Sequence, residues 1–307
     1  MNFVLVVPTY NPGVENWREW IDLLLLQTVQ PVATVVFDSS SDDGSMQLSK
    51  GAGFDLTVVE KKDFDHGGTR NEAVQYSMSK HPQVDVVVLL TQDSLLVEPD
   101  ALKELLNVFN TSDIAVAYGR QKPHESANPL AEHARKFNYG SESNVFTTLD
   151  VSSHGIDTVF CSNSFAAYST KYFKSLGGFP EKNILGEDML FACRALRAGL
   201  AKAYVAEAVV RHSHNYTLKE EFSRYFDTGV FHSINAKELS EYSEVSRKGF
   251  YFVRSECGFL IGKRSYYLFI APLYWCAKYI GFNLGKRFKS FPVRLNTLLS
   301  MHKSFWN

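Results

Sequence analysis

Acidic and imidazole side chains follow the apolar runs of this chain, and their types point to metal and phosphate chemistry. Asp93 comes directly after VVVLLTQ, and His212 and His214 come directly after AKAYVAEAVVR. One carboxylate at the exit of a buried strand can hold a hard cation such as Mg²⁺ or Mn²⁺ against a diphosphate. The sequence therefore predicts a divalent metal at Asp93, and the alternative is a cap for the following PDALKELL segment.

The two histidines are candidates for the same site. His212 and His214 are two residues apart, so on a strand both imidazoles point to one side. Neutral imidazoles ligate metals, and an imidazole also bonds to phosphate. We expect His212, or otherwise His214, to reach the site, and a purely structural histidine pair is the alternative.

The stretch DFDHGGTRNEAV, residues 63–74, places His66, two glycines and Arg70 at the start of an expected helix. Gly67 and Gly68 let the backbone turn or approach another group closely, and the unpaired N–H groups of a helix start suit phosphate. The alternative is a plain strand-to-helix turn with Thr69 as its cap.

Asp38 ends the run VATVVFD and is followed by the turn SSSDDGS. A carboxylate at a strand end accepts hydrogen bonds from a base or from ribose hydroxyls, whereas a turn that caps the next helix is the structural alternative. A dinucleotide-binding fold would need a glycine-rich turn after the first strand, and PTYNPG has proline and one glycine instead.

Glu187 and Asp188 stand at the start of the predicted helix EDMLFACRALRAG. Acids in a first helical turn are favoured by the helix dipole, which is the structural explanation. A carboxylate that faces an acceptor hydroxyl would instead be the general base of a transfer reaction. The spacing alone does not decide between these two roles.

Short apolar runs that alternate with helical patterns must position these groups. β-branched strands between helices predict an α/β fold with a mostly parallel sheet, in which ligands bind beyond the carboxyl ends of the strands. Residues 121–155 lack apolar periodicity and are expected to be rich in loops. From about Ser223 onward the pattern predicts mainly helix.

Composition places the chain among folded intracellular proteins. The 307 residues are 45% hydrophobic and 21% charged. The cysteines Cys161, Cys193, Cys257 and Cys276 have no paired spacing and predict reduced thiols, and the N-terminus shows no secretory signal. We therefore expect a cytoplasmic protein.

The net charge of -1 hides a segregation of charge. Residues 257–307 hold eight Lys and Arg and no acid, so the 32 basic residues leave 24 for the first 256 positions, against 33 acids. Basic side chains among Trp, Tyr and Phe suit an anionic membrane surface. The alternatives are a helix that packs on the catalytic body or a homo-oligomer interface.

SYYLFIAPLYWCAKYIGF is interrupted by Pro272 and Lys278 and is too short to span a bilayer. No nucleic-acid module accompanies the basic tail, so nucleic acid is not an expected partner.

Taken in order, VVPTYNP, FDSSSDDGS, GGTRN, LLTQDS, GGFPE and ED resemble the inverting glycosyltransferases of family 2, which have the GT-A fold. Within the family the chain is most similar to bacterial rhamnosyltransferases of O-antigen-type surface polysaccharides. The segments that carry this likeness are DHGGTRNEA, CSNSFAAYS, RHSHNY, RYFDTGVFH and SMHKSFW. The resemblance implies a GT-A catalytic domain over residues 1–235 and a helical, membrane-associating extension over 236–307.

The resemblance also assigns roles to single positions. Asp188 matches the catalytic base, with Glu187 beside it. Asp93 matches the surviving acid of the metal motif, where Thr91 replaces a second Asp of many relatives, so His212 is expected to add a ligand. The positions that match donor contacts are Pro8, Tyr10, Asp38, His66, Gly67, Gly68, Arg70 and Gln92.

The implied substrates are dTDP-L-rhamnose as donor and a polyprenyl-diphosphate-linked glycan as acceptor, at the cytoplasmic face of the inner membrane. A UDP-sugar donor on the same fold is the enzymatic alternative. A non-catalytic subunit that only binds a nucleotide sugar is the second. Sugar nucleotidyltransferases are disfavoured, because the chain lacks their glycine-rich start with Arg and Lys.

Overall fold

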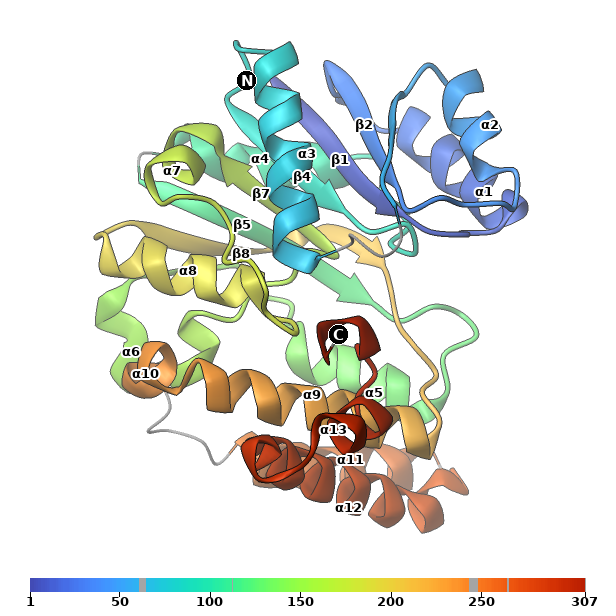
Figure 1. The fold of residues 1–307 in the computed structure, drawn as a ribbon, viewed down its shortest axis with the longest axis vertical. Helices are drawn as coiled ribbons and strands as arrows, with labels where there is room; N and C mark the ends of the chain where they lie inside the picture. Colours follow the sequence, from blue (N-terminus) through green and yellow to red (C-terminus); the bar gives the residue numbers. More distant parts are fainter. Residues whose placement is uncertain (61–64, 112, 243–247, 264, 307) are drawn as a thin grey trace.

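An eight-stranded sheet runs through the molecule in the order β3-β2-β1-β4-β7-β5-β8-β6 (Figure 1). The computed structural model describes residues 1–60, 65–111, 113–242, 248–263 and 265–306. The strands are β1 Phe3–Thr9, β2 Ala33–Asp38, β3 Asp55–Val58, β4 Val86–Leu90, β5 Ile114–Lys122, β6 Asn144–Phe146, β7 Phe165–Ser169 and β8 Ala201–Arg211.

The sheet is mostly parallel, as the sequence predicts. β3, β2, β1 and β4 pair in parallel, β5 pairs in parallel with β8, and only β7 and β6 run antiparallel to their neighbours. Because β7 is reversed between β4 and β5, the residues just before it meet the carboxyl end of β4. This brings residues 162–164 to the edge where the parallel strands end.

Helices cover both faces of the sheet and extend below it (Figure 1). They are α1 Val14–Leu25, α2 Ser45–Gly51, α3 His66–Lys80, α4 Ala101–Asn107, α5 Pro129–Asn138, α6 Val151–His154, α7 Thr170–Ser175, α8 Glu187–Arg197, α9 Leu218–Ile234, α10 Ala236–Leu239, α11 Lys248–Gly262, α12 Tyr267–Lys286 and α13 Val293–Leu299. The helical content after Ser223 is confirmed.

Alternation along the buried strands builds one hydrophobic core on each face. In β1, Val4 and Val6 join the core under α3, α8 and α9, whereas Leu5 and Val7 join the core under α1 and α4. Strands buried on both faces explain why these runs are continuously apolar rather than alternating.

The C-terminal helices are fastened to α9 by a close helix crossing. A Cβ atom on Gly285 would lie 2.0 Å from the carbonyl oxygen of Phe226, and one on Gly229 would lie 2.2 Å from that of Phe282. Glycine at these positions lets the backbones of α9 and α12 touch, so larger residues would push the helices apart. Whether residue 235 is a domain boundary stays a prediction.

Two expectations need correction. The stretch 121–155 contains the helix α5 and the strand β6 within an otherwise irregular path. Asn128 caps α5 and Pro129 occupies its first turn, which is a start signal that apolar periodicity alone does not register. His212 and His214 lie just beyond β8, which ends at Arg211, rather than on the strand.

Candidate active site

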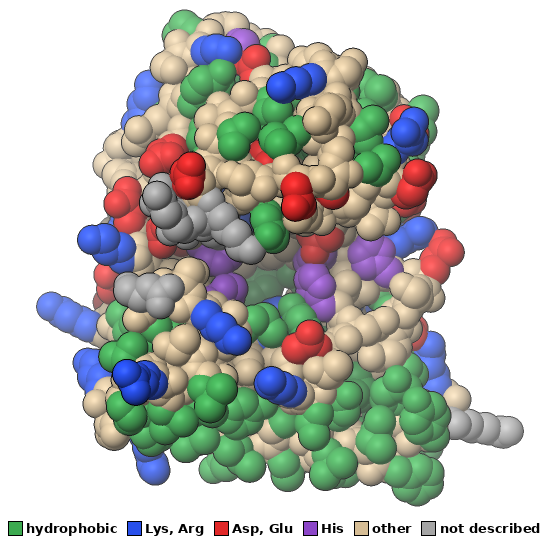
Figure 2. All heavy atoms as spheres, turned by 45° about the vertical axis from the view of Figure 1, so that its right-hand side comes forward, with side chains coloured by type: hydrophobic (Ala, Val, Ile, Leu, Met, Phe, Trp, Pro, Cys, Tyr) green, Lys and Arg blue, Asp and Glu red, His purple; other side chains and the backbone are tan. Residues whose placement is uncertain are grey.

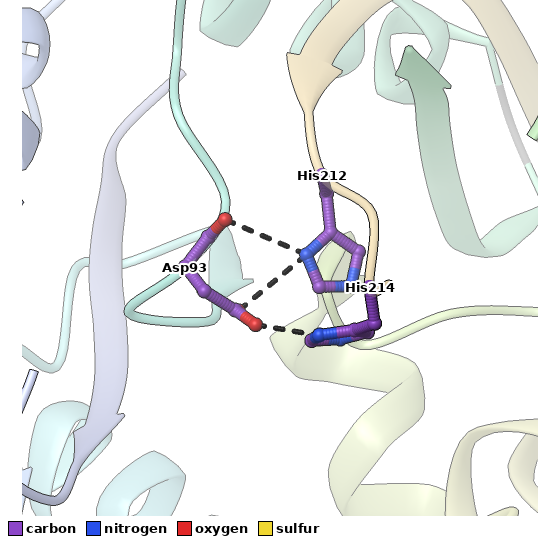
Figure 3. A group of neighbouring side chains, drawn as sticks. All are labelled: Asp93, His212 and His214. Atoms are coloured by element: carbon purple, nitrogen blue, oxygen red, sulfur yellow. Dashed lines mark hydrogen bonds and ion pairs between the residues drawn. The ribbon is translucent and has the colours of Figure 1, made fainter. Parts of the chain in front are cut away.

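Asp93, His212 and His214 form a cluster at the carboxyl edge of the sheet (Figure 3). Asp93 Oδ1 is 3.5 Å from Nδ1 of His212, and Asp93 Oδ2 is 3.5 Å from Nε2 of His214. One ligand atom from each residue lies within 4.8 Å of the others. A carboxylate with two imidazoles suits Mn²⁺ or another divalent ion whose remaining positions are filled by water or phosphate oxygens.

The protonation states of the cluster suit metal binding. Burial lowers the pKa of His212 to about 4, so its imidazole is neutral at neutral pH. Although burial opposes ionisation of Asp93, His212 and the Thr91 hydroxyl, 2.7 Å away, hold the pKa of this carboxyl below its ordinary value. The Thr91 hydroxyl thus donates a hydrogen bond to Asp93. The Ser164 hydroxyl lies 3.2 Å from Nε2 of His212 and orients the ring, as outer-shell partners of metal ligands do.

The two carboxylates at the start of α8 have opposite surroundings. Glu187 is buried, 3.1 Å from the guanidinium of Arg70, and its Oε1 accepts a hydrogen bond from the side chain of Asn163. Burial opposes ionisation, but Arg70 and His66 outweigh it and hold the pKa of Glu187 below its ordinary value. Glu187 is therefore an ionised structural partner of Arg70.

Within the described part of the chain Asp188 forms no ion pair, and the charge of Arg70 acts on its pKa less than burial and Glu187 do. Burial, reinforced by the charge of Glu187, raises the pKa of Asp188 to about 7. Its Oδ2 accepts a hydrogen bond from the backbone N–H of Asn163 at 3.0 Å, which fixes the carboxyl in place. A positioned carboxyl whose pKa lies near neutrality is a suitable general base, and the contrast with Glu187 separates the roles of the adjacent acids.

Two consecutive residues before β7 connect these groups. Asn163 contacts both Asp188 and Glu187, and the next residue, Ser164, contacts His212. The backbone N–H of Thr91 also donates to the carbonyl of Ser164. The reversed strand β7 thereby brings the candidate base next to the candidate metal cluster. The sequence analysis quoted CSNSFAAYS but assigned no role to Asn163 or Ser164.

The helix α3 begins at His66, and its capping residue is Asp65. The alternative prediction, in which Thr69 caps the helix, is therefore wrong about the capping residue. Asp65 Oδ2 accepts a hydrogen bond from the N–H of Gly68 at 2.6 Å, and Thr69 instead accepts one from the N–H of Asp65. A Cβ atom on Gly67 would lie 2.1 Å from the carbonyl oxygen of Pro180. The glycine is thus required by the close approach of the GGFPE segment. Positions 63 and 64 of the quoted stretch lie outside the described residues.

The C-terminal segment reaches the same helix start. His302 Nδ1 lies 3.3 Å from Nε2 of His66, and Arg70 contacts the other ring nitrogen of His66 at 3.3 Å. Asp227 on α9 accepts hydrogen bonds from the backbone N–H groups of Met301 and His302, which anchors the segment. Sequence reasoning missed His302, although SMHKSFW was among the quoted motifs.

The ends of β1, β2 and β4 are locked together. The side-chain amide of Gln92 accepts from the N–H of Tyr10 at 2.7 Å and donates to its carbonyl at 3.1 Å. Asp38 is 1% exposed, and its carboxylate accepts hydrogen bonds from the Thr9 hydroxyl and from both the N–H and the hydroxyl of Ser41. Pro8 lies in β1 opposite Phe37. Donor contacts by Pro8, Tyr10, Asp38 and Gln92 stay predictions.

Comparisons with known proteins are consistent with this geometry. A family model described as "Glycosyltransferase like family 2" matches residues 2–226. The chain is 45% identical over 306 residues to the O-antigen chain rhamnosyltransferase WbaN of Salmonella anatum, covering 100% of this chain and 96% of that protein. It is 46% identical over 308 residues to the O-antigen chain rhamnosyltransferase RfbN of Salmonella typhimurium, with the same coverage.

Solved structures share the fold at low identity. The mannosyltransferase PcManGT from Pyrobaculum calidifontis, in complex with GDP-Man and Mn²⁺, superposes with a TM-score of 0.60 at 16% identity, covering 92% of this chain and 86% of that one. S. aureus TarS 1-349, in complex with UDP-GlcNAc, gives a TM-score of 0.56 at 20% identity, covering 98% and 84%. These likenesses confirm the GT-A fold.

Proposed function

The chain belongs to glycosyltransferase family 2, and from this premise we propose that it transfers L-rhamnose from dTDP-L-rhamnose to a polyprenyl-diphosphate-linked glycan of O-antigen synthesis. The observation that carries the proposal is the carboxyl of Asp188. Its pKa lies near neutrality. The backbone N–H of Asn163 holds it in place, and the next residue, Ser164, contacts His212 of the metal-competent cluster. The rhamnosyltransferase names of the two full-length relatives support the choice of sugar.

In the proposed reaction, Asp188 removes the proton from an acceptor hydroxyl while that oxygen attacks the anomeric carbon of the donor sugar. The bond between that carbon and the diphosphate breaks in the same displacement, so the configuration inverts. Glu187 stays ionised against Arg70 and fixes the start of α8, while its charge keeps Asp188 basic.

The residues Asp93, His212 and His214 are suited to hold Mg²⁺ or Mn²⁺, and a bound ion would neutralise the diphosphate that leaves. His66, Gly67, Gly68 and Arg70 are proposed to lie near that diphosphate. Arg70 then acts on the donor indirectly, by holding His66 and the start of α3 in position, because its own guanidinium is already paired with Glu187.

A transfer assay tests the proposal directly. Purified protein, Mn²⁺, radiolabelled dTDP-L-rhamnose and an extracted polyprenyl-diphosphate-linked glycan should give label in the organic phase. The anomeric configuration of the product, read by NMR, should be opposite to that of the donor. Label incorporated from UDP-glucose or UDP-N-acetylglucosamine instead would move the proposal to the alternative donor class. Donor binding without any transfer would favour a non-catalytic subunit.

A membrane-facing surface supports the lipid-linked acceptor. Figure 2 shows hydrophobic side chains gathered over the lower part of the molecule, where the C-terminal helices lie, with Lys and Arg among them. No helix in the described part of the chain is long and apolar enough to cross a bilayer. We propose that this surface lies on the cytoplasmic face of the inner membrane. Its most exposed apolar side chains include Phe250, Tyr266, Phe269, Leu273, Tyr279 and Leu298. Arg264, one of the basic residues of the tail, lies outside the described residues.

Sedimentation with liposomes tests the surface without removing a helix. Phe269 is 82% exposed and Leu273 is 58% exposed, so Phe269→Asp with Leu273→Asp should leave the fold intact. We expect the double variant to lose binding to anionic vesicles, while the wild type binds them better than neutral vesicles. The matched control is Leu149→Asp, outside the C-terminal helices, where an 87% exposed leucine should tolerate the charge without effect. Equal sedimentation of the wild type and the double variant would refute the membrane surface.

A further inference from the structure

An arginine of the motif RYFDTGVFH, Arg224 on α9, has no role in the function described so far. Its Nη1 donates a hydrogen bond to the hydroxyl of Tyr216 at 2.9 Å, and its guanidinium carbon lies 5.3 Å from the centre of that ring. The ring of Tyr216 in turn stacks on His214, with 5.0 Å between the ring centres. Arg224 is therefore one side chain removed from the Asp93, His212 and His214 cluster.

No carboxylate among the described residues forms an ion pair with Arg224. Glu221, one turn earlier on α9, lies 3.5 Å from the ammonium of Lys278. Arg224 is exposed to solvent, and its contact with Tyr216, which stacks on His214, places it beside the cluster of Asp93, His212 and His214. The structure thus holds a guanidinium group in place while leaving most of its donors open.

A second arginine lies near it. Arg135 on α5 donates to the side-chain oxygen of Gln121, and its Nε is buried without a hydrogen-bond partner. Burial lowers the pKa of Arg135, and the positive charge of Arg224 acts in the same direction, so the two cations repel each other. An anion bound at Arg224 would offset this repulsion.

The C-terminal segment contributes a neutral imidazole, the side chain of His302. Burial lowers the pKa of His302 to about 4, and the charges of His66 and Arg224 contribute to this shift. Asp227 fixes the backbone of His302 from the same helix that carries Arg224, three residues away in sequence. A neutral imidazole that responds to the charge of Arg224 can donate an N–H to the same anion as the guanidinium group, which favours a phosphate or diphosphate.

We propose that Arg224, aimed by Tyr216, is an anion-binding residue beside the cluster of Asp93, His212 and His214 and receives a diphosphate group of a substrate. The inference rests on the proposed function for the sources of that group. These are the diphosphate of the nucleotide-sugar donor and the diphosphate that links the acceptor glycan to its lipid. Both present the same chemistry to Arg224.

Calorimetry and kinetics on Arg224→Gln in the full-length protein test the assignment. Loss of a charge-assisted bidentate contact should weaken the bound diphosphate by about tenfold to a hundredfold. If the donor supplies it, the affinity for dTDP in the presence of Mn²⁺ falls. If the acceptor supplies it, dTDP affinity is kept, and the KM for the diphosphate-linked acceptor rises by that factor with kcat nearly unchanged.

Matched variants separate this effect from others. Tyr216→Phe leaves the guanidinium but removes its hydrogen-bond acceptor. We therefore expect a smaller change in whichever quantity, dTDP affinity or acceptor KM, responds to Arg224→Gln. Arg18→Gln removes an exposed arginine of α1 and should change neither quantity. Unchanged dTDP affinity and unchanged acceptor KM in a folded Arg224→Gln protein would overturn the proposal. An equal loss in Arg18→Gln would also overturn it, because net charge would then be the cause.

The probe inorganic pyrophosphate keeps this result separate from the transferase proposal. If the wild type transfers no rhamnose yet binds pyrophosphate, and Arg224→Gln weakens that binding at least tenfold, the proposed function fails while the anion site stands. If pyrophosphate binds both proteins equally and neither substrate arm changes, the anion site fails regardless of which sugar is transferred.

Discussion

The ends of β2 and β4 carry the same signal in the sequence, an aspartate after a buried apolar strand, yet the two carboxylates have different surroundings. The carboxylate of Asp38 is 1% exposed, and donors from Thr9 and Ser41 already occupy it. The side chain of Asp93 is 42% exposed and faces two imidazoles, with the Thr91 hydroxyl as its side-chain donor. An acid whose hydrogen bonds are satisfied by neighbouring protein groups holds the strand ends together, whereas one left open beside neutral imidazoles is available to a ligand.

The same distinction separates the adjacent residues Glu187 and Asp188. Glu187 is matched by Arg70, and Asp188 is left with a raised pKa and backbone donors only. Four experiments test whether satisfied and open carboxylates differ as this comparison requires.

The largest effect is expected from Asp188→Asn. Removing the general base should lower kcat by about 10²–10⁴-fold, because the acceptor proton then has no positioned group to take it. Affinity for dTDP and Mn²⁺ should stay within twofold. Steady-state transfer kinetics with calorimetry on the same preparation measure both. Full turnover by the Asn variant would remove Asp188 from its role.

The strand ends themselves are compared by Asp93→Asn and Asp38→Asn. Asp93→Asn removes the open carboxylate. It should weaken Mn²⁺ binding by more than the roughly 10–100-fold that is lost when a residue hydrogen-bonded to a metal ligand is mutated. Loss of the satisfied carboxylate should leave Mn²⁺ affinity unchanged and lower the free energy of unfolding by about 1–3 kcal/mol. Electron paramagnetic resonance of free Mn²⁺ and urea denaturation distinguish the two. The comparison is wrong if both variants lose metal equally.

The pH dependence of transfer follows from the open carboxyl of Asp188. Its pKa of about 7 means that the base form is lost as the pH falls through neutrality. We expect log kcat/KM to rise with a slope of one below pH 7, about tenfold per unit, and to level off above it. A profile that stays flat from pH 5.5 to pH 8, at about constant metal occupancy, would contradict a base of this pKa.

The smallest effect concerns stability. The folded pKa of Asp188, about 7, lies above the ordinary 3.8, so the folded protein holds this proton more tightly than the unfolded chain. Stability therefore falls as the pH rises from about 4 to about 7, and the penalty is complete above that range. Asp188→Asn should raise the melting temperature at pH 8 and leave it nearly unchanged at pH 4. Calorimetric melting at both values checks the sign, and a lower melting temperature at pH 8 would contradict it.

The sequence predicts the sheet because its strands are buried on both faces and read as continuous apolar runs, as in VVVLL of β4. The rule for parallel strand ends also predicts that Asp93 lies at the edge where ligands bind, whereas Asp188, at the start of α8, reaches that edge through its contact with Asn163. The sequence does not reveal that Asp38 is enclosed, because Thr9 lies in β1, 29 positions away, and joins Ser41 of the local turn at the carboxylate only once β1 and β2 pair.

The contribution of the C-terminal segment was also hidden from sequence reasoning. His302 meets His66 across 236 positions of the chain, and the hydrogen bonds from Asp227 that hold it there follow no local pattern. Residue spacing reports on neighbours within one helix or strand. Contacts between segments far apart in the chain depend on how the helices α9, α12 and α13 pack, which only the structure supplies.

The most direct test of the account is calorimetric titration of the full-length protein with dTDP-L-rhamnose, UDP-glucose and UDP-N-acetylglucosamine, each with Mn²⁺ and after its removal by chelation. We expect that dTDP-L-rhamnose binds most tightly, that binding weakens strongly without the metal, and that Asp93→Asn reproduces the loss. Equal, metal-independent binding of all three donors, or no binding by a folded protein, would contradict it.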